Sequence, residues 1–314
     1  MGKKDLWQID YFDDKERFAD MINGSIFHGK TVMKPEELEE ADSKLVHHEK
    51  SGEAVNVIRD KVYKWKGKYI SICILENQSY VDYRMVFRVM LEEAVSYIKQ
   101  QKKAYKKWKD AGYKFNGNEF LSQMRKEEKF IPVITLILYL GKEEIWDGAK
   151  SLYELLKIDE DLKPFVTNYK LNLFDYHEDK DFSRFKTDNR FLFELLANSK
   201  DKNKTGEIIR EYLNDYFIDR ETADAIFGIL DIKEDMNKYK KKTEKGDKVN
   251  MCKAWEDQKE SGRQEGRQEG RQEGRKEALT TNLKCIMKNL KVNIQQAMDI
   301  LEIPVEERGQ YVSL

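Results

Sequence analysis

Two carboxylates and one amide stand at the ends of neighbouring stretches that have the composition of β-strands. Glu76 and Gln78 follow the apolar run 69–75, and Asp60 precedes a segment of turn composition at 65–68. This order predicts a β-hairpin with its acidic residues near the open end. Because alternate residues of a strand share a face, Glu76 and Gln78 are expected on one face, ~7 Å apart.

The first strand of this hairpin is expected to run from Val55 into Asp60 and on towards the turn. Pairing across a turn near 66–67 brings Asp60 opposite residues 73–76, and a bulge would move the register by one or two places. Asp60 can therefore reach the neighbourhood of Glu76. Carboxylates bind Mg²⁺, which activates water and neutralises developing charge in phosphodiester hydrolysis. The pattern thus predicts a metal-dependent nuclease centre.

The arrangement resembles the PD-(D/E)xK nuclease superfamily, with Asp60 as the first acid, Glu76 as the second and Gln78 where lysine is usual. Within that superfamily, the chain from about residue 10 to residue 314 resembles the recombination-promoting nuclease (Rpn) and transposase-like family. The matching residues are Arg59-Asp60, Glu76-Asn77-Gln78, Asp82-Tyr83-Arg84-Met85 and Arg88, followed by a helix and the apolar strand 130–140.

The resemblance implies an α/β fold with a restriction-endonuclease-like core, a mixed central sheet flanked by helices, and a helical C-terminal extension. It implies a DNA endonuclease whose cofactor is Mg²⁺, with Mn²⁺ as a substitute. Asp60 and Glu76 would be the metal ligands, and Gln78 would orient water or phosphate.

Two positions depart from the superfamily pattern. Arg59 stands where a proline usually precedes the first acid, and Gln78 cannot supply the positive charge of lysine. Both departures favour an alternative, a catalytically inactive DNA-binding or interaction protein that keeps the nuclease fold. An RNA nuclease would use the same ligands, so the residues leave the kind of nucleic acid open.

A helix before the hairpin often contributes a further acid in the resembled superfamily. Residues 13–26 carry apolar side chains three and four apart, which predicts an amphipathic helix. Asp20 is the candidate for an additional metal ligand on this helix, and Glu16 is the second choice. Solvated helical acids are the alternative interpretation.

Residues 83–109 predict a long helix whose apolar stripe lies against the sheet. Arg84 and Arg88 are four residues apart and share one face, where they could bind DNA phosphates bidentately or remain ordinary surface arginines. The far end is rich in lysine, with Tyr105 and Trp108 interleaved, a pattern that fits either a phosphate-binding surface or a solvated helix end. The apolar stripe consists of Phe87, Met90, Leu91, Ala94 and Ile98.

The run 130–140 is apolar on both faces, which is typical of a central strand covered on both sides. A further strand is expected at 169–173. A sheet followed by helices is typical of an α/β core with a helical extension. The expected helices span 149–157, 191–197, 208–217 and 222–230.

Four segments are expected along the chain. Residues 1–234 would form the nuclease domain with its helical extension, and 235–261 a charged linker. Residues 262–277 repeat Gly-Arg-Gln-Glu, closing as Gly-Arg-Lys-Glu, and 278–314 would be a helical tail. In the tail, an apolar stripe at 279–290 and a second helix at 293–301 are expected.

The repeat places like residues at i and i+4, so a helix would stack its arginines in one column and its glutamates in another. Like charges at this spacing repel, and each glycine costs ~1 kcal/mol relative to alanine. A second copy could pair arginine with glutamate columns. We therefore expect a helix that depends on self-association, giving a homo-oligomer, with a flexible spacer as the alternative.

The composition sets limits on partners and compartment. With 57 basic and 58 acidic residues, the chain has no global attraction to nucleic acid, so DNA must be bound by local patches. The three cysteines are odd in number and far apart, which indicates a reducing, cytoplasmic compartment. The longest apolar run, 130–140, is too short to cross a membrane. His47 and His48, in an expected loop at 45–53, lack a second ligand pair for zinc, and His177 is expected to be a surface or core residue.

Overall fold

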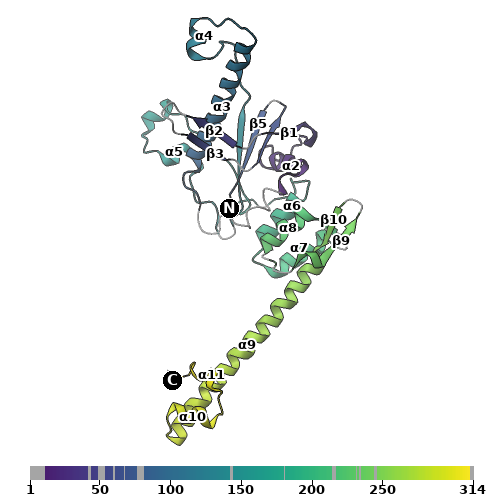
Figure 1. Ribbon diagram of the computed structural model, residues 1–314, viewed down its shortest axis with the longest axis vertical. Helices are drawn as coiled ribbons and strands as arrows, with labels where there is room; N and C mark the ends of the chain where they lie inside the picture. Colours follow the sequence, from purple (N-terminus) through teal and green to yellow (C-terminus); the bar gives the residue numbers. More distant parts are fainter. Residues whose placement is uncertain are drawn as a thin grey trace. The chain divides into compact units, whose positions relative to one another are not determined.

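The structure is a computed structural model that describes residues 11–41, 44–48, 54–58, 61–66, 68–75, 81–141, 144–179, 181–213, 217–230, 232, 235–243 and 246–311. The chain divides into two compact units. The first comprises Met1–Ile232 and Asn237–Cys252, and the second comprises Lys233–Met236 and Lys253–Leu314. The first unit has a mixed α/β fold, and most of the second is helical (Figure 1).

A five-stranded sheet forms the centre of the first unit, in the order β1-β4-β5-β6-β7. Its antiparallel part consists of β1 (Leu38–Glu40), β4 (Lys61–Trp65) and β5 (Lys68–Leu75). Strands β6 (Val133–Tyr139) and β7 (Asn172–Asp175) then continue it in parallel. Strand β6 has a hydrogen-bonded neighbour on each side, which makes it a central strand. The predicted central strand at 130–140 is confirmed.

The hairpin predicted around residues 65–68 is formed by β4 and β5. Trp65 pairs with Lys68, so two residues connect the strands, and the first of them, Lys66, has a φ of 40°. Positive φ values are what the favoured two-residue hairpin turns require. The hairpin and its turn are therefore confirmed.

The first strand of that hairpin begins later than predicted, at Lys61. Strand β3 (Ala54–Ile58) pairs instead with β2 (Lys44–His48) in a separate two-stranded sheet. The continuous strand predicted from Val55 through Asp60 is thus wrong. The loop predicted at 45–53 is wrong over 45–48, because β2 contains these residues, and 49–53 lie outside the described residues. Strand composition shows that residues are extended but does not identify the strand they pair with.

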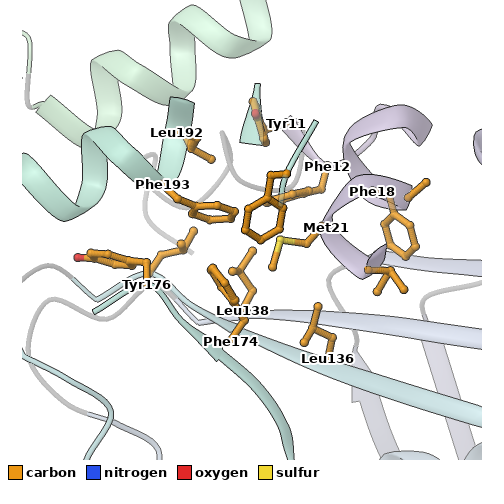
Figure 2. Packing of buried hydrophobic residues seen from close by; sticks show 14 of the residues in the cluster. Tyr11, Phe12, Phe18, Met21, Leu136, Leu138, Phe174, Tyr176, Leu192 and Phe193 are labelled. Carbon is orange, nitrogen blue, oxygen red and sulfur yellow. The ribbon is translucent and has the colours of Figure 1, made fainter. Parts of the chain in front are cut away.

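Helices α2 (Lys15–Ser25) and α6 (Asn189–Asn198) cover one face of the central sheet. Aromatic and aliphatic side chains from both helices meet the strands in one cluster, shown in Figure 2. Each such buried side chain contributes roughly 1.5–3 kcal/mol to folding. The helix predicted at 13–26 is confirmed. The cluster includes Phe18, Met21, Leu136, Leu138, Phe174, Leu192 and Phe193.

Helix α3 (Met85–Asp110) covers the other face. Its residues Met85 and Val89 pack with Ile137 and Tyr139, which alternate along β6 with the side chains of the first cluster. The sheet is therefore enclosed between helices on both faces. The closer likeness to a restriction-endonuclease core stays a prediction.

The face of α3 that meets the sheet is not the predicted one. Phe87, Leu91 and Ile98 of the predicted stripe are 49%, 47% and 38% exposed. At about 100° per residue, the buried Met85 and Val89 lie on nearly the opposite side of the helix. The helix has two apolar stripes. The buried stripe also contains the charged residue Glu92, so it is harder to recognise as apolar in the sequence.

The remaining elements of the first unit lie around this core. A second sheet has the order β8-β10-β9, and two of its strands lie in the segment predicted to be a charged linker. The bounds are η1 (Pro35–Glu37), α4 (Gly117–Ser122), α5 (Leu152–Leu155), η2 (Glu160–Phe165), α7 (Lys202–Leu213), β8 (Phe217–Asp219), α8 (Arg220–Leu230), η3 (Met236–Tyr239), β9 (Lys240–Thr243) and β10 (Gly246–Asn250).

The second unit is built on helix α9 (Met251–Leu290), followed by α10 (Ile294–Ile300) and α11 (Val305–Arg308). The glycine repeat lies within α9, and its side chains are exposed. The end of α9 packs against the two short helices through a small core that includes Leu283, Met298, Ile303 and Tyr311. The predicted second helix is confirmed, and Asn293 caps it by accepting the N–H of Gln296 at 2.9 Å.

Candidate functional site

The predicted catalytic residues Asp60, Glu76 and Gln78 lie outside the described residues, and their roles stay predictions. The strands next to them in the chain are described. β4 begins at Lys61, directly after Asp60, and β5 ends at Leu75, directly before Glu76. Lys61 pairs with Ile72, so both strand termini lie at the open end of one antiparallel hairpin. The structure therefore places Lys61 and Leu75, the chain neighbours of Asp60 and Glu76, at the same end of the hairpin.

The carboxyl ends of three parallel strands lie in one row beside this hairpin end. Leu75 of β5 pairs with Tyr139 of β6, which pairs with Asp175 of β7. At roughly 4.8 Å between neighbouring strands, Leu75 and Asp175 are about 10 Å apart. Ligands of open α/β sheets bind outside the carboxyl ends of the strands. This edge of the sheet is the candidate site.

Asp175 provides a buried carboxylate at this edge, with 4% of the residue exposed. It accepts the N–H of Trp146 at 2.8 Å and the N–H of His177 at 2.9 Å. The same carboxylate lies 2.7 Å from Nδ1 of the His177 ring, which stacks on Tyr176 with ring centroids 4.0 Å apart. A carboxylate held in this way orients an imidazole and leaves its other nitrogen available for a proton or a metal.

His177 also lines a cavity of about 730 Å³. This volume is typical of a small-molecule site, and charged groups of both signs line the cavity. One pair of them, Arg190 and Glu194, is joined by a hydrogen bond of 2.9 Å. The cavity therefore has a mixed lining of apolar and charged side chains, and His177 places it next to the carboxyl edge of the sheet. Its charged lining consists of Asp179, Asp181, Arg190, Glu194, Lys204 and Glu211.

The Asp175–His177 pair is not predicted by the sequence analysis, which treats His177 as a single histidine without a neighbouring acid. The available signal was its place two residues after Asp175, at the end of an apolar segment with strand composition. Side chains that directly follow a parallel strand lie at the edge where sheets bind ligands.

The structure places Asp20 on helix α2, where 7% of the residue is exposed. Its Oδ1 accepts the N–H of Lys186 at 2.9 Å. Its Oδ2 accepts the N–H of Thr187 at 3.1 Å, the hydroxyl of Thr187 at 2.7 Å and the side-chain amide of Asn189 at 3.2 Å. In this arrangement the carboxylate fixes the loop before α6 to α2, and the role of Asp20 as a metal ligand stays a prediction. Glu16, the second choice, is exposed on the same helix.

The two candidate phosphate-binding arginines meet on one acid. Nε of Arg84 lies 3.1 Å from Oδ1 of Asp82, and Nη1 of Arg88 lies 3.1 Å from its Oδ2. Burial opposes the charge of Asp82, but hydrogen bonds from Arg84 and Arg88 outweigh it, so the pKa of Asp82 is lowered. The side chains of Arg84 and Arg88 remain 79% and 41% exposed. Phosphate binding by this pair stays a prediction.

The described residues contain no group of three or more His, Cys, Asp or Glu side chains placed to hold a metal ion. Of the three predicted Mg²⁺ ligands, Asp60 and Glu76 lie outside those residues, and Asp20 already accepts four hydrogen bonds. Hard carboxylate oxygens are the donors that Mg²⁺ prefers, so Asp60 and Glu76 have the appropriate chemistry.

Residues 61–216 match the family model described as "Putative transposase, YhgA-like". The match covers just under half of the 314 residues and begins directly after Asp60. It includes Glu76, Gln78 and the carboxyl edge of the parallel strands, so this part of the chain is similar to that family. Searches of curated proteins and of solved structures found no match to the chain.

None of the helices formed by the described residues is long and apolar enough to cross a membrane.

Proposed function

We propose that this protein is a Mg²⁺-dependent DNA endonuclease of the transposase-like type. The observation that carries the proposal is the hairpin of β4 and β5, whose open end adjoins Asp60 and Glu76 in the chain. This end belongs to the carboxyl edge of the parallel strands, where open sheets bind ligands. The similarity of residues 61–216 to a transposase family supports DNA as the substrate.

Each predicted residue has a distinct role in this proposal. Asp60 and Glu76 hold Mg²⁺, which when bound supplies an activated water and neutralises charge on the phosphate. Gln78 orients water or phosphate through its amide. Arg84 and Arg88 contact flanking phosphates, for which their exposed guanidinium groups are suited.

The Asp175–His177 pair supports the same site by its position and chemistry. It lies in the row that also contains Leu75, the residue before Glu76. An imidazole oriented by a buried carboxylate can move a proton to or from a reacting oxygen. In the proposed reaction, this pair would accept or return the proton of the attacking water or of the leaving group.

The substrate and the cofactor can be tested in one assay. Supercoiled plasmid and a structured RNA are incubated separately with the protein in Mg²⁺, Mn²⁺, Ca²⁺ or chelator. The proposal predicts nicking or linearisation of plasmid in Mg²⁺ and Mn²⁺, with no reaction in chelator. If the protein cleaves the RNA but not the plasmid, the substrate is RNA and not DNA. Cleavage that persists in chelator would contradict the metal-dependent mechanism.

A second function is favoured by Gln78, because glutamine lacks the cation that lysine would place beside the phosphate. The protein would then be a DNA-binding or interaction protein that keeps the nuclease fold without catalysis. Calorimetry separates the two functions. The nuclease proposal predicts that wild type gives a heat of Mg²⁺ or Mn²⁺ binding and that Asp60→Ala abolishes it. The alternative predicts no heat of metal binding in wild type or in Asp60→Ala.

A further inference from the structure

The distal half of helix α3 presents lysines on one face. Six of them lie between Lys99 and Lys109, and all six are exposed. At about 100° per residue they occupy a sector about 160° wide, over about 15 Å of helix. Asp110, the last residue of α3, shares this sector. We call this surface the lysine face, and it consists of Lys99, Lys102, Lys103, Lys106, Lys107 and Lys109.

The opposite side of the same helix segment is occupied by packing. Helix α4 lies beside the C-terminal end of α3, and the segment around it covers the aromatic residues of α3 (Figure 1). The Arg125 guanidinium lies over the rings of Trp108, at 4.0 Å, and Tyr113, at 4.7 Å. Nε1 of Trp108 donates to Glu128 at 2.8 Å. The lysine face is therefore held in a fixed orientation away from this packed side.

Such a surface is electrostatically unfavourable by itself, because like charges three and four residues apart on a helix repel. No ion pair joins Lys103, Lys106 or Lys109 to a carboxylate in the part of the chain that the structure describes. A DNA duplex carries one phosphate charge per ~1.7 Å, or about nine over the ~15 Å length of the lysine face. The lysine face and the duplex are opposite in sign, with six lysines against about nine phosphates over the same length.

We infer that the lysine face binds the phosphate backbone of double-stranded DNA and holds the substrate independently of the predicted metal ligands. The inference rests on the proposed function for its choice of DNA, and it adds a surface that places the duplex on the enzyme. Contacts of this kind position nucleic acid without selecting its sequence.

The same segment argues against single-stranded nucleic acid. Surfaces that bind single strands stack the bases on accessible aromatic rings. Here Trp108 and Tyr113 lie under Arg125, and Tyr105 packs on Phe115 with ring centroids 4.8 Å apart. These rings are half-buried and already make contacts within the protein, so the lysine face itself consists of charged side chains without a free aromatic ring.

The test measures DNA binding in chelator, where metal-dependent cleavage cannot occur. Fluorescence anisotropy follows a labelled duplex, its single strand and an RNA duplex of the same sequence between 50 and 200 mM salt. The test variant changes Lys103, Lys106 and Lys109 to glutamine. The matched control changes three other exposed lysines, Lys30, Lys157 and Lys202, to glutamine and thus alters the net charge equally. Circular dichroism confirms that all variants are folded.

We expect the test variant to bind duplex DNA at least about tenfold more weakly than wild type, and the control less than about twofold. The slope of log affinity against log salt should fall by about 2 to 3 in the test variant, since each lost phosphate contact removes ~0.9. Equal losses in test and control would overturn the inference. So would an absence of DNA binding by wild type, or tighter binding of the single strand or the RNA duplex.

The inference and the proposed function can fail separately. If wild type binds duplex through the lysine face but never cleaves plasmid in Mg²⁺, the inference stands and the nuclease proposal fails. If wild type cleaves plasmid while the test variant binds DNA as tightly as wild type, the nuclease proposal stands and the inference fails.

Discussion

The carboxylate of Asp20 joins two segments that are 166 residues apart in the chain. Four donors converge on it, from Lys186, Thr187 and Asn189. An asparagine in its place would turn one acceptor oxygen into an NH₂ group that faces donors. Hydrogen bonds to charged groups contribute about 1.5–3 kcal/mol, so Asp20→Asn should lower the free energy of unfolding by about 2–3 kcal/mol in chelator.

Urea unfolding measures this loss, and Glu16→Gln, at an exposed position of the same helix, is the matched control. A loss no larger than in the control would contradict the structural role of Asp20. Repeating the titration in Mg²⁺ tests the predicted metal ligand, because binding to the folded state adds stability. If Asp20 is a ligand, Mg²⁺ should stabilise wild type more than Asp20→Asn.

A pH-dependent contribution is expected from Asp219. Burial, the strongest influence on this carboxyl, favours its neutral form, but the N–H of Thr222 at 2.9 Å and the guanidinium of Arg17 at 2.7 Å outweigh it, so the pKa of Asp219 is lowered. The unfolded-state value is ~3.9. Because the folded-state pKa is lower, the stabilisation is present above about pH 4 and is lost as pH falls through the folded-state pKa.

Asp219→Asn should therefore cost about 1–3 kcal/mol of unfolding free energy at pH 7, through weakened hydrogen bonds to a charged group. The difference from wild type should shrink below about pH 4. Unfolding by urea at several pH values measures it, with Glu221→Gln on the adjoining helix as control. A difference that is constant from pH 7 to pH 2 would refute the assignment.

At the scale of single residues, the sequence indicates which side chains could bind a metal or move a proton, but not which groups they form hydrogen bonds with. The acidity of Asp20 suggested a metal ligand, whereas its hydrogen-bond donors lie in a loop far away in the chain, which no local pattern indicates. His177 likewise became a candidate only when the register placed Asp175 beside Tyr139. Roles that depend on long-range contacts therefore needed the fold.

At the scale of elements, substitutions in the two apolar stripes of α3 should differ in how much stability they cost. Met85 is 1% exposed and packs with Ile137, whereas Leu91 is 47% exposed. Met85→Ala should lower the free energy of unfolding by about 2–5 kcal/mol, as is typical of a buried large-to-small change. Leu91→Ala should cost less than about 1 kcal/mol. Chemical denaturation of both variants gives the comparison, and a greater loss in Leu91→Ala would show that the predicted stripe is the buried one.

Elements with a strong local signal were predictable. Helix α2, strand β6 and the β4–β5 hairpin follow from periodicity, apolar runs and turn composition. The pairing of β3 with β2 was not predictable, because a segment with alternating apolar residues can pair with more than one strand. Strands β9 and β10 were also missed, since the lysines of Lys240–Thr243 resemble a solvated linker.

At the scale of the whole molecule, the glycine repeat lies in the long helix of the second unit. The structure forms a helix through all four repeats, and an added Cβ at Gly262, Gly266, Gly270 or Gly274 would meet nothing within 4 Å. Four glycines cost about 4 kcal/mol relative to alanine in a helix. A repeat of four exceeds 3.6 residues per turn, so a seam between two copies would wind right-handed. Pairing of arginine and glutamate columns between copies would offset the cost.

Comparison of the full chain with a chain ending at Glu260 tests this self-association. The shorter chain retains all of the first unit, which ends at Cys252. Sedimentation and circular dichroism over a dilution series should show the full chain losing mass and helicity together, while the shorter chain stays monomeric and folded. Helicity that does not change with concentration in a monomeric full chain would rule the proposal out and leave a single-chain helix or a spacer.

The proposed function requires that Glu76, the residue that follows β5 in the chain, binds the metal ion needed for DNA cleavage. The most direct measurement compares plasmid cleavage by wild type and Glu76→Gln in Mg²⁺, with unfolding free energy and DNA binding in chelator measured in parallel. Glutamine keeps the volume but removes the charge that Mg²⁺ requires. We predict that Glu76→Gln folds and binds DNA like wild type but does not cleave it. Wild-type cleavage rates in Glu76→Gln would contradict the assignment of Glu76 as a metal ligand.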